Sequence, residues 1–215
     1  MTVHQRVRAL FVSLALGGAL CAALPAVTAS AAPSFSPRAA APVGVHVAPS
    51  RTAAAAEGTG AAAAEGTGLS WLMLPSQRTL VVDVVDKTGD AWPVQAASSG
   101  WATAHVRYAY VSSCRAGVPC VVVREGSYGR TGWNGMTTAV AGQMFTFTSP
   151  VQIQLNDSYG LSASEHRAVT CHELGHALGL DHDNRASSCL QPVAQAAGPD
   201  SLDRAQLEQL YAPTG

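Results

Sequence analysis

The stretch HELGHALGLDH, residues 172–182, places three histidines and one glutamate at fixed spacing. It has the pattern H-E-x-x-H-x-x-G-x-x-H. Because residues four apart lie on one face of a helix, His172 and His176 can direct their imidazoles at one metal ion. Gly179 permits a sharp turn of the chain, which would bring His182 back as a third ligand. Three protein ligands leave one position of a tetrahedral zinc ion open, which is the arrangement of a catalytic site.

Glu173 follows the first of these ligands and projects about 100° around the helix from it. At that angle it is poorly placed to bind zinc, but it can reach a zinc-bound water. We therefore expect Glu173 to act as the general base and to pass the proton to the leaving amine. The pattern predicts a hydrolase with one catalytic zinc ion.

The sequence around this motif predicts an α+β domain with a twisted mixed sheet, an active-site helix and a C-terminal helix. Ser162 and Glu165 form a capping box, so the active-site helix should begin there and extend over 163–178, with Gly179 ending it. Upstream, a helix capped by Asp90 is expected over 91–101, with Pro93 in its first turn. The expected strands are 78–85, 105–111, 121–124 and 152–155, a long glycine-rich turn spans 126–135, and the last helix covers 202–211.

The motif resembles that of the metzincin clan of zinc endopeptidases, and the similarity to the matrixins (matrix metalloproteases, M10-type) extends further. Matrixins carry a Met-turn of the form Leu-Met-x-Pro eight residues after the third histidine. Here the segment Cys-Leu-Gln-Pro at 189–192 places Leu190 at the Met-turn position. The ending LDRAQLEQLY also resembles the matrixin terminal helix. Small bacterial proteases of the snapalysin type are similar in scale, but they have Asp where this chain has His182.

The resemblance implies a metzincin fold, a zinc endopeptidase activity and protein or peptide substrates. It also implies that a strand near 137–147 holds the substrate as an added β-strand. Three features depart from the matrixin pattern. Leu190 replaces the methionine of the Met-turn. Because the two side chains have similar volumes, this replacement should lower the stability of the fold by less than about 1.5 kcal/mol. Asp183 stands where matrixins usually have serine, and an aspartate at this position is typical of adamalysins. Finally, no segment resembles the cysteine-switch propeptide.

The cysteines fit this resemblance. Cys171 directly precedes the first ligand and Cys189 directly precedes Leu190, so a bond between them would join the active-site helix to the Met-turn. Such a bond would stabilise the fold by on the order of 3 kcal/mol. Cys21 lies in the expected signal peptide (residues 1–31), so Cys114 and Cys120 then remain as the second pair. The alternative, in which Cys171 is a zinc ligand, is disfavoured because adjacent helical residues face different directions.

The first 68 residues differ in composition from the rest of the chain. Residues 1–31 have the layout of a secretory signal peptide, with a basic start, an apolar run over 9–24 and small residues after it. Residues 32–68 are rich in small residues and repeat the unit AAAAEGTG at 53–60 and 61–68, which predicts a disordered linker or a short propeptide. The catalytic domain is expected over 69–215, in a secreted, extracellular protein that contacts no membrane after signal cleavage.

Charge and composition limit the partners. Lys and Arg total 13 and Asp and Glu total 14, which argues against nucleic acid as a partner. We expect a monomer. The resemblance to matrixins, many of which carry calcium, raises a calcium site at Asp157, Asp181 and Asp183, but no spaced ligand motif supports it. Two other functions stay open: a zinc-stabilised secreted binding module without catalysis, and a zinc hydrolase of a non-peptide amide.

Overall fold

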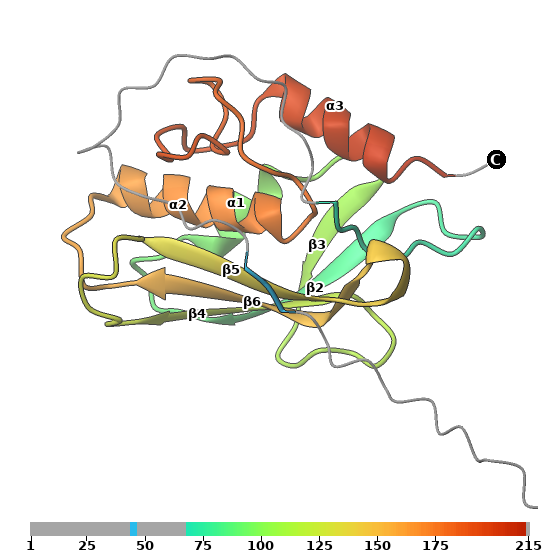
Figure 1. Cartoon of the computed structure of the whole chain (residues 1–215), viewed down its shortest axis with the longest axis horizontal. Coiled ribbons are helices and arrows are strands. Elements are labelled where there is room, and N and C mark those ends of the chain that lie inside the picture. Colours follow the sequence, from blue (N-terminus) through green and yellow to red (C-terminus); the bar gives the residue numbers. More distant parts are fainter. Residues whose placement is uncertain (1–43, 47–67, 214–215) are drawn as a thin grey trace, which may run out of the picture. The chain divides into compact units, whose positions relative to one another are not determined.

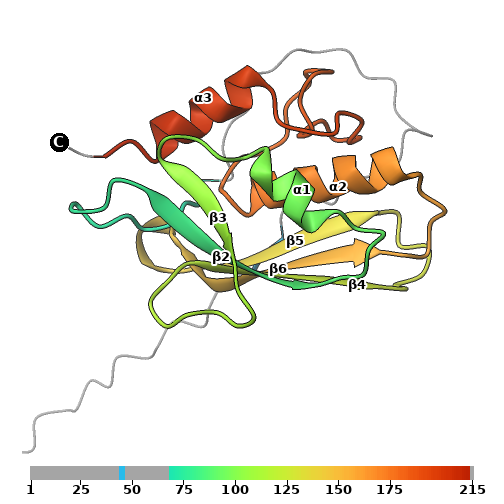
Figure 2. The ribbon, with the colours of Figure 1, turned by 180° about the vertical axis from the view of Figure 1, so that it is seen from behind.

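The computed structural model describes residues 44–46 and 68–213. The elements are β1 (Gly44–His46), β2 (Leu80–Lys87), α1 (Val94–Ser99), β3 (Val106–Tyr110), β4 (Cys120–Gly126), β5 (Gly135–Ala141), the short helix η1 (Gln143–Phe145), β6 (Phe147–Asn156), α2 (Ala163–His176) and α3 (Ser201–Leu210). The strands form one sheet in the order β1-β5-β6-β4-β2-β3. Helices α1 and α2 lie side by side over one face of the sheet (Figure 1), and α3 lies beyond them (Figure 2).

The sheet is mixed, as expected. The pairs β2–β3, β2–β4 and β4–β6 are parallel, whereas β5 runs antiparallel to β6 and to β1. Valine-rich runs in β2 and β4 favour strand structure, and central parallel strands are buried on both faces. Their helix-facing side chains form the main core with α2, and a smaller cluster of Val85, Cys120 and Val122 covers the opposite face. The α+β class predicted from the sequence is therefore confirmed.

Two elements begin three or more residues away from the expected position. The first helix begins at Val94 with Pro93 as its N-cap, and Asp90 does not cap it. Proline fits the start of a helix because it has no N–H to donate, so the regular helix begins only after it. Strand β6 begins at Phe147, five residues before the expected 152, and continues through Pro150. The region 137–147 is not one strand, because β5 ends at Ala141 and a turn with left-handed residues precedes β6.

Helix α2 has the expected capping box: the Ser162 hydroxyl accepts from the Glu165 N–H, and the Glu165 carboxylate accepts from the Ser162 N–H. Four carbonyl groups, two in the C-terminal half of the helix and two just after it, accept hydrogen bonds from aromatic side chains. The donors and acceptors are Trp101 Nε1 to Cys171 O, Tyr108 Oη to Leu174 O, Trp71 Nε1 to Ala177 O and Tyr211 Oη to Leu178 O, at 2.7–3.0 Å. Carbonyls at the end of a helix lack intrahelical donors, so the bonds to Leu174, Ala177 and Leu178 fix the end of α2 in the core.

None of the helices in 44–46 and 68–213 is long and apolar enough to cross a membrane. The signal peptide predicted at 1–31 lies outside the described residues. So does the segment 32–68, apart from Gly44–His46 in β1 and Gly68.

Candidate metal centre

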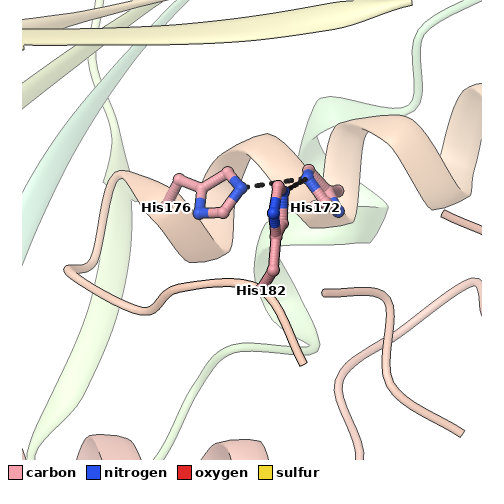
Figure 3. Close-up of side chains that lie close together, drawn as sticks. All are labelled: His172, His176 and His182. Atoms are coloured by element: carbon pink, nitrogen blue, oxygen red, sulfur yellow. Dashed lines mark hydrogen bonds between the residues drawn. The ribbon is translucent and has the colours of Figure 1, made fainter. Parts of the chain in front are cut away.

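The three histidines of the motif converge on one point (Figure 3). His172 and His176 come from α2, and His182 comes from the segment that follows it. The Nε2 atom of His172 lies 2.9 Å from that of His176 and 3.1 Å from that of His182. A tetrahedral zinc ion needs ligand nitrogens roughly 3.3 Å apart. The three side chains therefore fit such an ion after a small outward movement.

The second ring nitrogen of each helical ligand is bonded to a backbone carbonyl. His172 Nδ1 lies 2.8 Å from the Cys189 carbonyl oxygen, and His176 Nδ1 lies 2.8 Å from that of Leu180. A carbonyl oxygen can only accept, so each Nδ1 carries the proton and each Nε2 presents a lone pair. Partners of this kind orient metal-binding imidazoles and fix their tautomer.

The imidazoles are held in their neutral form. Burial places the pKa of His172 well below its ordinary value, and the neighbouring His176 and His182 lower it further. Burial and His182 lower the pKa of His176 to about 3. Burial also lowers the pKa of His182, although Asp181 and Asp183 oppose this shift. Because metal ions bind neutral imidazole, protons compete only weakly for this site near neutral pH.

Gly179 directs the chain from α2 towards the third histidine. It has φ +92°, a backbone conformation that side chains rarely adopt. A Cβ atom here would lie 2.4 Å from the Leu69 carbonyl oxygen. The Gly179 N–H donates to His176 O at 2.9 Å, and Leu180 N–H donates to Gly175 O at 3.2 Å. The turn expected from the sequence is thus present, and it leads to His182.

Glu173 lies beside the triad on α2, fully buried beneath β5. The Thr137 hydroxyl lies 2.7 Å from Glu173 Oε2 and 3.0 Å from the Glu173 backbone oxygen. A Cβ atom at Gly135 would lie 2.7 Å from Glu173 Cγ and Oε1. Thr137 and Gly135 could not be recognised as site residues from the sequence, because nothing local to β5 indicates that its residues contact the motif.

The Met-turn position is occupied by a buried leucine. Leu190 lies against α2, where a Cβ atom at Gly175 would be 2.7 Å from Leu190 Cδ2. The disulfide Cys171–Cys189 joins α2 to this segment, and the second disulfide is Cys114–Cys120. Both pairs match the sequence expectation. Since Cys189 also supplies the carbonyl for His172 Nδ1, the disulfide holds that carbonyl close to the ligand.

The three aspartates considered for calcium have other partners. Asp157 accepts from Trp92 Nε1 at 2.7 Å, and Asp181 accepts from the His182 backbone N–H at 2.7 Å. Asp183 forms an ion pair with Arg185 at 2.7 Å. Within the described part of the chain, the His triad is the one group of His, Cys, Asp or Glu side chains found to be placed for a metal ion. Calcium binding stays a prediction without structural support.

Arg185 also reaches the start of α3. Its guanidinium contacts Asp200 at 2.8 Å and Asp203 at 2.5 Å, in addition to Asp183. Burial raises the pKa of Asp203 to about 6. Burial opposes ionisation of Asp200 as well, but its hydrogen bonds with Arg185 and the helix start lower its pKa below the ordinary value. Asp183, which departs from the matrixin pattern, therefore links the third-ligand segment to α3.

A buried triad of neutral imidazoles with a carboxylate on the adjacent helical face is the donor set of a metal-dependent hydrolase. The matrixin family model matches residues 89–212. This is more than half of the 215 residues, and the chain belongs to the matrixin family. Membership implies a zinc metallopeptidase-type function with protein or peptide substrates. A search of curated proteins found no match.

Proposed function

We propose that the protein is a secreted zinc metalloendopeptidase in which His172, His176 and His182 hold the metal and Glu173 is the general base. The observation that carries the proposal is the convergence of the three Nε2 atoms beside a buried glutamate on the same helix. A purely structural zinc site has no use for a base at that position. Family membership adds support for peptide hydrolysis.

The side chains around the site have separate tasks. When bound, zinc lowers the pKa of a coordinated water and polarises the carbonyl of the scissile bond. Glu173 takes the proton from the attacking water and delivers it to the departing amine. The Cys189 and Leu180 carbonyls keep the lone pairs of His172 and His176 directed at the ion. The buried setting strengthens each of these electrostatic interactions.

Strand β5 is the proposed docking edge for the substrate. Its helix-facing residues Gly135 and Thr137 contact Glu173, so a peptide paired with this strand would lie next to the base. On the side away from β6, β5 pairs antiparallel with β1. This pairing supports the idea that the edge accepts an extended chain by β-augmentation.

Secretion is proposed from the sequence of residues 1–31. The two disulfides are compatible with an oxidising compartment, where such bonds persist.

Digestion of casein tests the proposed function. We expect the purified protein to cleave it, a chelator to abolish cleavage, and added zinc to restore both cleavage and the bound metal. Fragment mapping by mass spectrometry should then show internal peptide bonds as the sites of hydrolysis. If the zinc-loaded protein cleaves neither casein nor a peptide library, a non-catalytic binding module or a hydrolase of non-peptide amides would replace this proposal.

A further inference from the structure

Strand β5 contacts the proposed base, Glu173, through a hydrogen bond from the Thr137 hydroxyl to the carboxylate. The Thr137 hydroxyl has a single hydrogen, and its shorter contact is to the Glu173 carboxylate, at 2.7 Å against 3.0 Å for the backbone oxygen. Thr137 is fully buried, as is Glu173. In a buried setting, hydrogen bonds to charged groups are stronger than those between neutral groups. The hydroxyl therefore restrains the carboxylate more than a packing contact would.

Gly135, two residues earlier on the same face of β5, leaves the space that this carboxylate occupies. A Cβ atom there would approach Glu173 Cγ and Oε1 to 2.7 Å and Val169 Cγ1 to 2.8 Å. Such distances are too short for a side chain, so even alanine would displace Glu173 or Val169. Residues 135 and 137 thus act together, one by providing space and the other by providing a donor.

We propose that Thr137 is a positioning residue for Glu173: it holds the carboxylate through its hydroxyl in the space left by Gly135. This inference rests on the proposed function, because a positioned base matters only if Glu173 moves a proton. Thr137 itself does not contact the substrate's reacting atoms. Its effect should therefore appear in kcat and not in KM.

The test compares T137V, which has the same shape without the hydroxyl, with T137S, which keeps it. We expect T137V to lower kcat for a peptide substrate about ten- to hundred-fold, with KM within about twofold and zinc content unchanged. T137S should restore kcat to within about threefold of the wild type, because a hydroxyl is again present. T170V is the matched control, since it removes a buried hydroxyl of α2 that bonds to His166 O and not to Glu173.

Equal losses of kcat in T137V and T137S, or no loss in either, would overturn the proposal. If the wild type cleaves no peptide, the proposed function fails but the positioning can still be tested by crystallography. The Glu173 carboxylate should then keep its place in T137S and leave it in T137V. An unmoved carboxylate in T137V would count against the role of Thr137.

Discussion

Replacing Glu173 by glutamine is expected to lower kcat/KM for a peptide substrate by about 10²–10⁴-fold, the contribution typical of a general acid–base group. Glutamine has nearly the same shape but cannot accept the proton of the attacking water. Zinc should stay bound, because the three imidazoles and their carbonyl partners are untouched. Steady-state kinetics with a fluorogenic peptide, together with metal analysis of the same samples, measures both quantities.

The control for this substitution is E165Q, on the same helix. Glutamine still completes a capping box with Ser162, so helix α2 should form and activity should stay within about twofold of the wild type. Loss of zinc together with activity in E173Q would indicate a structural role for Glu173. Full activity with zinc bound would show that another group moves the proton.

The sequence was most informative where one local pattern determines the geometry. His172 and His176 lie four residues apart on a capped helix, so their convergence follows from helical geometry. The position of His182 follows from the turn that Gly179 permits. Both disulfides could be predicted because, of the four cysteines that follow the expected signal peptide, two flank functional positions of the resembled family.

Contacts between distant segments could not be predicted in this way. Thr137 reaches Glu173 across 36 residues, and the pattern of β5 alone does not show which helix residue lies above it. The start of α1 was misplaced because Pro93 and Asp90 both favour a helix start, and the choice between them depends on packing. The beginning of β6 was also missed, since Pro150 suggested a break where the strand continues.

Asp183 shows how a departure from the family pattern can be explained by the structure. Its carboxylate pairs with Arg185, which also binds Asp200 and Asp203 at the start of α3. The Asp183 N–H donates to the Leu190 carbonyl oxygen at 3.0 Å. The residue after the third ligand is thereby bonded to both the Met-turn segment and the last helix. The aspartate that replaces the matrixin serine is therefore part of a network of ion pairs and hydrogen bonds that joins these segments.

Replacing Gly179 by alanine is expected to lower both the stability of the fold and its zinc affinity. The residue has φ +92°, where non-glycine residues are strained by roughly 1–3 kcal/mol. The added Cβ would also lie 2.4 Å from the Leu69 carbonyl oxygen, so the backbone must move. Together these costs should lower the free energy of unfolding by about 3 kcal/mol or more.

The same movement should reach the metal site, because Gly179 determines the direction in which the chain leaves α2 towards His182. We expect zinc affinity, measured by chelator competition, to fall at least about tenfold, since a displaced third ligand weakens the site. G198A is the matched control, because a Cβ there meets nothing within 4 Å. If G179A destabilises the fold but binds zinc normally, then His182 is positioned by its later contacts and not by this turn. Such a result would assign the placement of the third ligand to the network of Asp183 and Arg185.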